Sequence, residues 1–421
     1  MKIRIDNARI MGEGQPTHFL IQDNIIVQDF DPNDFSKERV IDVRGAALFP
    51  GLIDAHCHLR EPGYEYKEDI ESGTKSAAKG GYSSVCCMPN TLPVCDNASV
   101  VSGIVKTAVE KGSANVFPIG AASKGMAGKE LSEIGLMKEA GIVAVSDDGR
   151  PIASADQLRK ILEYASQFNI PVLNHCEEMS IADGAMNEGA LSTQMGLRGI
   201  PTAAENIMIA RDLLMAEYLD LPIHICHVSN KRGVELIAEA KSRGVKVTAE
   251  TCPHYFSLTE DACEGYNTNA KMNPPLRTQE DCDAIIKGIA DGTIDIIVTD
   301  HAPHHEDDKT IEFALAQNGI VGFETAFALG YTHLVKPRHI NLERLIDAMC
   351  VRPSQILSLG RGTLKPGAPA DITCFDLEDE YSFDKNSMLS KARNTPFDGH
   401  KLTGKCLLTI TGGRITYDAL R

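Results

Sequence analysis

One pattern recurs from residue 51 onward and limits the fold more than any other feature: a short β-type run is followed by a helical pattern. Strands that alternate with helices form parallel sheets, and eight of them suit a closed (β/α)8 barrel. The sequence therefore predicts an α/β fold with a TIM-like barrel, and an open doubly wound sheet is the alternative. The eight β-type runs are residues 52–58, 83–88, 115–120, 142–146, 171–175, 222–227, 245–251 and 294–300.

The stretch between the fourth and fifth runs illustrates how well the helical patterns are formed. Ser154 and Gln157 have the spacing of a capping box, which satisfies backbone N–H groups at the start of a helix. Four apolar residues then recur at the i, i+3, i+4 and i+7 positions of a single helix face. They are Leu158, Ile161, Leu162 and Ala165.

The two ends of the chain have a different texture. Residues 1–50 hold short β-type runs separated by turn residues, and β-type runs rich in Gly, Pro and Thr return from about residue 360. We expect the two ends to meet as one small β-sandwich beside the barrel. The expected domains are therefore residues 1–50 plus 360–421 for the sandwich and residues 51–359 for the barrel.

The composition excludes several classes of protein. With 421 residues, the chain is long enough for one large α/β domain and a smaller one. Its formal net charge of -16 argues against nucleic acid or an anionic membrane as the main partner. No segment reaches the ~20 apolar residues of a membrane span, and the first residues lack the apolar core of a signal peptide. We therefore expect a cytoplasmic protein.

Cysteine usage points to the same compartment. The chain has 12 cysteines, but none of them forms a C-x-x-C motif, and several lie inside apolar β-type runs. Reduced thiols of this kind are common in the interior of cytoplasmic proteins. We therefore expect buried, unpaired cysteines rather than disulfides or a thiolate metal site.

Metal-binding residue types follow five of the eight β-type runs. In a (β/α)8 barrel these carboxyl ends form the face that carries the active site. Four histidines and two carboxylates can hold two divalent ions such as zinc, with one carboxylate bridging them. Such a pair supplies hydroxide near neutral pH and polarises the carbonyl that it attacks. The residues are His56, His58, either Asp147 or Asp148, His175, His227 and Asp300.

Arg60 adds a feature that a metal site alone does not need. Side chains alternate between the two faces of a strand, so His56, His58 and Arg60 point the same way. A guanidinium is the natural partner of a carboxylate. The end of the first strand therefore offers two metal ligands and a cationic side chain that can bind an anionic substrate.

Taken together, these motifs resemble those of the class I dihydroorotases of the amidohydrolase superfamily. The resemblance runs from about Gly51 to Ala326 and is highly specific as a combination, whereas the chain ends match only in general texture. It is carried by HCHLREPG (56–63), MPNT (88–91), DDG (147–149), NPPLR (273–277), TDHAPH (299–304) and GFET (322–325).

The resemblance implies a small-molecule reaction, the reversible closure of N-carbamoyl-L-aspartate to L-dihydroorotate in de novo pyrimidine biosynthesis. It also implies one or two zinc ions per chain, with a two-zinc site preferred. His56, His58 and Asp300 would bind the first ion, His175 and His227 the second, and Asp148 would bridge. Arg60, Asn90 and His304 would hold the substrate carboxylate, while Asn273 and the backbone of Asn318 and Gly319 would contact the ring.

In this mechanism Asp300 is the catalytic residue, because it takes the proton of the hydroxide and passes it to the leaving nitrogen. Many superfamily members bridge their metals with a carboxylated lysine after the fourth strand. No lysine lies between Ile142 and Gly149, and class I bacterial dihydroorotases resemble this sequence in using an aspartate there. The task of His254 stays open, and we expect the loop of residues 302–319 to close over substrate.

Three alternatives follow from the same residues. A hydantoinase or an allantoinase would share the metal ligands, but a neutral ring needs no Arg60. An inactive dihydroorotase-like subunit that only scaffolds aspartate transcarbamoylase would have lost metal ligands, and a metal-storage protein would need neither Arg60 nor Asn90. A homodimer and an association with aspartate transcarbamoylase are the macromolecular partnerships that this interpretation allows.

Overall fold

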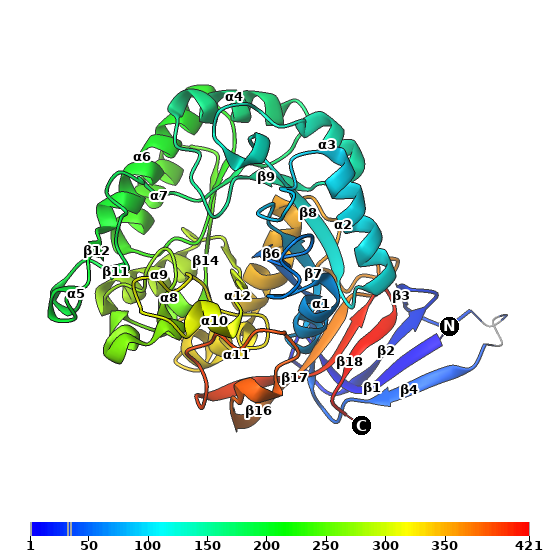
Figure 1. Cartoon of the computed structure of the whole chain (residues 1–421). Helices are drawn as coiled ribbons and strands as arrows, with labels where there is room; N and C mark the ends of the chain where they lie inside the picture. The colour runs from blue at the N-terminus through cyan, green and yellow to red at the C-terminus, as the bar shows by residue number, and fades with distance from the viewer. Residues whose placement is uncertain (1, 32, 34–35, 421) are drawn as a thin grey trace.

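The computed structural model describes residues 2–31, 33 and 36–420, and its centre is a ring of parallel strands (Figure 1). One four-stranded sheet contains β6 (Leu52–Cys57), β7 (Tyr82–Cys87), β8 (Asn115–Ala121) and β9 (Ala144–Ser146). A second contains β10 (Leu173–Asn174), β13 (Ile223–Ile225), β14 (Val247–Thr251) and β15 (Ile296–Ile297). Parallel bridges join Val145 to Val172 and Cys57 to His301, which closes the ring. All eight predicted runs are strands, and the open-sheet alternative is wrong.

Helices surround this ring (Figure 1). The longer ones are α1 (Ile70–Lys79), α2 (Ala98–Lys111), α3 (Ile134–Ala140), α4 (Ala155–Ser166), α6 (Thr202–Leu219), α7 (Lys231–Ser242) and α9 (Gln279–Asp291). Towards the end of the barrel, α11 (Ala326–Gly330) continues into a π-helical turn (Tyr331–Val335). A second π-helical turn (Asp347–Val351) joins α12 (Leu342–Ile346) to α13 (Arg352–Ile356).

Shorter elements occupy the connections. They are α5 (Ala190–Gln194), α8 (Pro253–Ser257) and α10 (Glu306–Lys309), the parallel pair β11 (Met186–Asn187) and β12 (Gly199–Ile200), and the 3-10 turns η1 (Lys124–Met126), η2 (Glu260–Tyr266), η3 (Thr268–Ala270) and η6 (Lys385–Ser387). The loop expected to act as a lid therefore contains α10 rather than being wholly irregular.

The local signals predicted for α4 are present in the structure. Ser154 is its N-cap, and the Ser154 hydroxyl accepts a hydrogen bond from the backbone N–H of Gln157 at 3.4 Å. The buried face consists of Leu158, Ile161, Leu162 and Ala165. The α4 face therefore packs inward as its 3.6-residue periodicity indicates.

Strands from both ends of the chain form one eight-stranded sheet. Its order is β18-β17-β16-β5-β1-β2-β3, and β4 pairs with β1. The bounds are β1 (Lys2–Ile10), β2 (Thr17–Gln22), β3 (Ile25–Val27), β4 (Glu38–Asp42), β5 (Ala47–Pro50), β16 (Ile372–Ser382), β17 (Lys401–Thr411) and β18 (Arg414–Asp418). Because β5 pairs with β1 on one side and with β16 on the other, it joins the two ends of the chain.

This sheet has an apolar core of its own. Side chains of its N-terminal and C-terminal strands meet in one buried cluster, which includes Ile3, Ile21, Leu48, Ile372 and Leu408. The predicted fold class, a (β/α)8 barrel with a small β domain built from both chain ends, is confirmed. The strands of this domain, predicted as a sandwich, pair as one eight-stranded sheet. On this basis we propose the division into residues 1–50 plus 360–421 and residues 51–359; positions 1, 32, 34, 35 and 421 lie outside the described residues.

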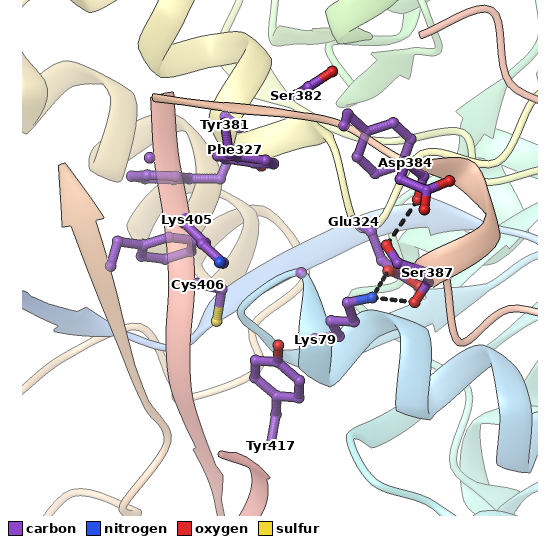
Figure 2. Close-up of a pocket in the computed structure, with 15 residues that line it drawn as sticks. Lys79, Glu324, Phe327, Tyr381, Ser382, Asp384, Ser387, Lys405, Cys406 and Tyr417 are labelled. Atoms are coloured by element: carbon purple, nitrogen blue, oxygen red, sulfur yellow. Dashed lines mark hydrogen bonds and ion pairs between the residues drawn. The ribbon is translucent and has the colours of Figure 1, made fainter. Parts of the chain in front are cut away.

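A mixed polar and aromatic junction ties the barrel to the sheet, and Figure 2 shows it from close by. Lys79, at the end of α1, forms an ion pair with Glu324 at 2.9 Å and donates to the carbonyl of Ser387. Phe327 of α11 stacks on Phe375 of β16 with 3.7 Å between the ring centroids. The junction encloses a cavity of about 220 Å³, which has no lining residue in common with the candidate active site described below.

All 12 cysteines are buried and none is in a disulfide within the described residues, as expected from their positions. Burial raises the pKa of the Cys87 thiol to about 12, so this side chain stays protonated at neutral pH. The other strand cysteines show shifts in the same direction. Buried thiols of this kind act as small apolar core residues.

Within the part of the chain that the structure describes, no helix combines the length and the apolar character needed to cross a membrane.

Candidate active site and metal centre

A cavity of about 250 Å³ lies at the carboxyl ends of the barrel strands, where this fold places its active sites. Eleven of the twelve predicted site residues line it: His58, Arg60, Asn90, Asp148, His175, His227, Asn273, Asp300, His304, Asn318 and Gly319. The twelfth, His56, is fully buried and lies within reach of the same carboxylates. The barrel thus brings together residues that are up to 263 positions apart, from His56 to Gly319.

One carboxylate and two histidines form the first half of the cluster. His56 and His58 stand at the end of β6 with both Nε2 atoms directed toward Asp300. Oδ1 of Asp300 lies 3.0 Å from Nε2 of His58 and 3.6 Å from Nε2 of His56. These three side chains supply two nitrogen donors and one oxygen donor around a common point, which is a zinc-type donor set.

Asp148 lies between the two pairs of histidines. Its Oδ2 is 3.3 Å from Nε2 of His56 and 3.5 Å from Nε2 of His58. Its Oδ1 is 3.3 Å from Nε2 of His227 and 3.5 Å from Nδ1 of His175. One carboxylate oxygen therefore faces each pair, which is the geometry of a bridging ligand.

Asp147, the neighbouring candidate, points elsewhere. Its carboxylate accepts hydrogen bonds from the backbone N–H and the hydroxyl of Ser123, at 3.0 and 2.5 Å. Both of these contacts lie outside the histidine cluster. The structure thus distinguishes the two adjacent aspartates. The sequence could not do so, because it does not show where the fourth strand ends.

Two observations on the chain itself show that these residues fit a metal ion. Nε2 of His56 is buried with no hydrogen-bond partner among the described residues, although it faces two carboxylates. Nδ1 of His175 and Nε2 of His227 approach to 2.9 Å, a close contact for two ring nitrogens that also face Asp148. Buried polar atoms need partners, and one or two cations between these nitrogens and carboxylates would provide them.

The electrostatics point the same way. Burial lowers the pKa of His56, but the carboxylates of Asp148, Glu250 and Asp300 outweigh it and raise the pKa well above its ordinary value. Similarly, burial opposes a charge on His175, yet hydrogen bonds to Asp148 and Glu177 raise its pKa to about 10. A cluster that holds protons this strongly has a high affinity for positive charge, and a divalent cation is the alternative occupant.

A second layer of residues orients the histidine rings. Glu250 of β14 is fully buried and lies 2.6 Å from Nδ1 of His56 and 3.0 Å from Nε2 of His224. Oδ1 of Asn90 lies 2.9 Å from Nδ1 of His58. Such partners hold the proton on one ring nitrogen and leave the lone pair of the other free for a metal.

Sequence reasoning missed Glu250 and Glu177. Glu177 lies 3.4 Å from Nε2 of His175 and accepts a hydrogen bond from the side-chain amide of Asn273 at 3.1 Å. It therefore links a metal-type ligand to a residue expected to contact the substrate ring. The signal for Glu250 was a carboxylate inside the β-type run 245–251, where an unpaired charge would be costly.

Three site residues have left-handed backbone conformations, which are rare outside glycine. The φ angles are 64° at Arg60, 33° at His227 and 46° at Asp300. Each of these conformations is energetically unfavourable and persists only where the surroundings enforce it. Here it allows the chain to turn sharply at a strand end while the side chain still points into the cavity.

Another part of the cavity wall is formed by Arg60, His304 and the segment of Asn318 and Gly319. Nε of Arg60 donates to the carbonyl of Pro303 at 3.2 Å, and Nε2 of His304 lies 2.8 Å from the carbonyl oxygen of Asn318. Gly319 has a φ of 120°, and a Cβ there would approach the Cβ of Ala302 to 2.6 Å. The chain can pass this close to Ala302 only with glycine at that position.

Two buried lysines hold this segment in place. Nζ of Lys271 donates to the carbonyls of Ala314 and Ala316 at 2.9 and 2.8 Å. Nζ of Lys309 donates to the carbonyls of Thr268, Lys271 and Gln317 at 3.0, 3.2 and 2.7 Å. Three of these bonds hold the carbonyls of Ala314, Ala316 and Gln317, in the backbone that leads to Asn318, and the other two attach Lys309 to the segment of Thr268 and Lys271.

His254 is close to the cluster but does not line the cavity. Its Nε2 is buried without a hydrogen-bond partner among the described residues. Burial lowers its pKa to about 3, although the carboxylate of Asp300 opposes the shift. At neutral pH it is therefore an uncharged imidazole, and its ring lies 4.2 Å from that of Tyr255 between centroids.

The (β/α)8 barrel, with histidines and aspartates gathered at its strand ends, is the structure of a cyclic amidohydrolase. The fold comparison agrees: the L-hydantoinase (dihydropyrimidinase) of Arthrobacter aurescens superposes with a TM-score of 0.87 at 26% identity, covering 99% of this chain and 96% of the other. D-hydantoinase structures with 20–23% identity share the fold alone.

Sequence comparison then narrows the class. Residues 45–233 match the family model described as Dihydro-orotase-like. The dihydroorotase of Acetivibrio thermocellus is 56% identical over 397 residues, which cover 94% of this chain and 93% of the relative. That of Ruminiclostridium cellulolyticum is 56% identical over 418 residues, covering 98% of each chain. The chain belongs to the dihydroorotase family.

Proposed function

We propose that this chain catalyses the reversible hydrolysis of the cyclic amide of L-dihydroorotate to N-carbamoyl-L-aspartate, a step of de novo pyrimidine biosynthesis. The observation that carries the proposal is the place of Arg60, which lines the same cavity as Asp148, His175, His227 and Asp300. A carboxylate hook beside a metal-type cluster suits a cyclic amide that also bears a carboxylate.

We propose zinc as the metal, with one or two ions per chain and a two-ion site preferred. Nitrogen and oxygen donors of this kind suit zinc. A divalent ion in such a site polarises a carbonyl oxygen and lowers the pKa of a coordinated water. The ligands would be His56, His58 and Asp300 for one ion, His175 and His227 for the other, and Asp148 for both.

Asp300 is proposed as the catalytic acid and base. Its carboxylate lines the cavity, and the charges of His56 and His58 lower its pKa although burial raises it. It is therefore ionised at neutral pH and can take a proton from the attacking water. The same group can then deliver that proton to the ring nitrogen as the amide C–N bond breaks.

The remaining cavity residues would bind and orient the substrate. Arg60 and His304 would hold its carboxylate, together with the side-chain amide of Asn90, whose Oδ1 faces His58. Asn273 and the backbone of Asn318 and Gly319 would contact the ring. Holding the scissile amide at a fixed place beside the cluster removes much of the entropic barrier to reaction.

The two other candidates are less well supported. A hydantoinase or an allantoinase shares the fold, but its ring substrate offers no carboxylate for Arg60. An inactive scaffold subunit would be expected to have lost metal ligands, whereas here each of the four histidines lies 3.6 Å or less from Asp148 or Asp300. We also propose a homodimer, an association with aspartate transcarbamoylase and a cytoplasmic location. Sedimentation of the purified chain with and without the transcarbamoylase would test the homodimer and the association.

The direct test is an ultraviolet assay of dihydroorotate hydrolysis on the purified protein, run beside a metal analysis of the same sample. We expect hydrolysis in proportion to the metal content. Hydantoin and dihydrouracil serve as neutral-ring controls. A preparation that hydrolyses the neutral rings but not dihydroorotate would replace this proposal with the hydantoinase-type function, and a metal-loaded protein inactive on all three rings would favour the scaffold subunit.

A further inference from the structure

His304 lines the cavity, and both of its ring nitrogens have polar neighbours. Nζ of Lys67 lies 3.3 Å from its Nδ1, and the carbonyl oxygen of Asn318 lies 2.8 Å from its Nε2. Nη2 of Arg60 also lies near Nε2, at 3.4 Å. The ring is buried, so these neighbours replace water as its polar environment.

The two closest contacts agree on a single state of the ring. An ammonium group has only N–H donors, so Nδ1 must be the acceptor and carry no proton. A carbonyl oxygen only accepts, so Nε2 must be the donor and carry the proton. His304 is therefore neutral, with its one proton on Nε2.

This state has a consequence for Arg60. With a proton on Nε2, the imidazole cannot accept from the guanidinium, so Nη2 of Arg60 and Nε2 of His304 are two donors only 3.4 Å apart. Two donors that converge in this way are suited to one acceptor between or beside them, and a carboxylate oxygen accepts strongly from both. His304 would then exchange the carbonyl of Asn318 for this ligand.

We propose that Lys67 is a positioning residue that keeps His304 neutral with its proton on Nε2, so that Arg60 and His304 together hold one substrate carboxylate. The charge is matched as well: one guanidinium faces one carboxylate. This inference rests on the proposed function for the identity of the ligand, but the state of His304 can be tested without any turnover.

The charged groups around His304 indicate how Lys67 acts on the protonation of the ring. Burial lowers the pKa of His304 well below its ordinary value, and the cations Arg60, Lys67 and Lys309 add to the shift. Asp308 is the opposing group: its Oδ2 lies 3.7 Å from Nδ1 of His304, but Lys67 pairs with that oxygen at 2.9 Å. Without Lys67, the carboxylate of Asp308 is free to accept a proton carried by Nδ1.

The first experiment compares the ring state of His304 in the wild type and in Lys67→Met by ¹⁵N spectra of histidine-labelled protein. His304→Gln identifies the signal. We expect the wild type to show a protonated Nε2 and an unprotonated Nδ1 across the neutral range, and Lys67→Met to gain a proton on Nδ1. A wild-type ring protonated on Nδ1, or an unchanged ring in Lys67→Met, would overturn the inference whatever the enzyme's substrate.

The second experiment measures the KM for dihydroorotate as a ratio of variant to wild type, from about pH 6 to about pH 8, the range in which an unperturbed histidine titrates. For Lys67→Met we expect a ratio of about ten across this range, because burial, Arg60 and Lys309 still keep the ring neutral and its Nε2 then turns a lone pair toward the carboxylate. The ratio of kcat values should change much less. Lys67→Arg, which restores a cationic donor, should give a ratio near one.

Lys385→Met is the matched control, since it removes a lysine that also lines the pocket next to His304 but pairs with Asp398 at 3.5 Å. Its KM ratio should stay near one. If Lys385→Met and Lys67→Met behave alike, the effect is one of overall charge and the assigned role of Lys67 is wrong. Absence of dihydroorotate turnover in the wild type would instead count against the proposed function and leave the spectroscopic test in force.

Discussion

Oε1 of Glu250 lies 2.6 Å from Nδ1 of His56, and both side chains are completely buried. The same carboxylate reaches Nε2 of His224 at 3.0 Å. The two histidines lower the pKa of Glu250 although burial raises it, so the carboxylate is ionised at neutral pH. It therefore keeps a proton on Nδ1 of His56 and leaves Nε2 to face Asp148 and Asp300.

This relationship predicts that Glu250→Gln weakens metal binding while the fold is retained. An amide is a weaker hydrogen-bond acceptor than a carboxylate, so the ring of His56 becomes a weaker ligand for a cation. Loss of a partner of this kind typically lowers metal affinity or activity roughly 10- to 100-fold. Metal retained after dialysis against a weak chelator would measure the effect. Glu217→Gln, an exposed glutamate paired with Arg243, is the control. Full retention in Glu250→Gln would contradict the prediction.

Metal content is the second prediction. The purified chain should carry one to two zinc-like ions, because six donor side chains meet at the strand ends. Removal by a strong chelator should abolish hydrolysis, and zinc should restore it. Elemental analysis before and after treatment gives the stoichiometry. A metal-free protein with undiminished activity would rule out this assignment of the cluster.

Asp300→Asn should fold but lose most of its activity. General acid–base catalysis contributes roughly 10²–10⁴-fold, and the same change weakens a metal-type ligand beside His58. Metal analysis of the variant separates the two effects, and a thermal unfolding curve checks the fold. The control is Asp283→Asn on the exposed face of α9. Near-normal turnover by metal-loaded Asp300→Asn would exclude the assigned role.

Arg60 should decide between two otherwise similar rings. Dihydroorotate carries a carboxylate that dihydrouracil lacks, and a hydrogen bond to a charged group contributes about 1.5–3 kcal/mol. The wild type should therefore favour dihydroorotate by roughly 10²-fold or more in kcat/KM. Arg60→Met should erase most of this preference without loss of metal, and Arg60→Lys should rescue it only in part.

The preference of Arg60→Met is the decisive measurement for that role. If this variant discriminates between the two rings as well as the wild type does, the carboxylate is held by other residues. If the wild type itself prefers dihydrouracil, the hydantoinase-type function applies instead.

Closure of the loop of residues 302–319 over substrate stays a prediction. In the structure this loop is held by Lys309 and Lys271, and the side-chain amide of Asn394 donates to its carbonyls at Ala302 and Gly319, both at 3.0 Å. Bound substrate should slow proteolysis within the loop, and Lys309→Met should speed it in the absence of substrate. Equal cleavage with and without substrate would count against closure.

Much of the fold was determined by the sequence alone, because it depends on local periodicity. Each of the eight β-type runs is short, apolar and followed by a helical pattern, so eight parallel strands were predictable. The side-chain alternation of a strand likewise placed His56 and His58 on one face at the end of β6. The residue types at the other strand ends were sufficient to predict a metal cluster and a carboxylate hook.

The neighbours of these residues, by contrast, depend on how the barrel and its loops fold. The tertiary structure distinguished Asp148 from Asp147, because the turn at the end of β9 directs one carboxylate to the histidines and the other to Ser123. It also brought Glu250 under His56 and Lys67 against His304, which are 194 and 237 positions apart. Periodicity acts over a few residues, whereas these contacts exist because the barrel closes and the long loops fold over its rim.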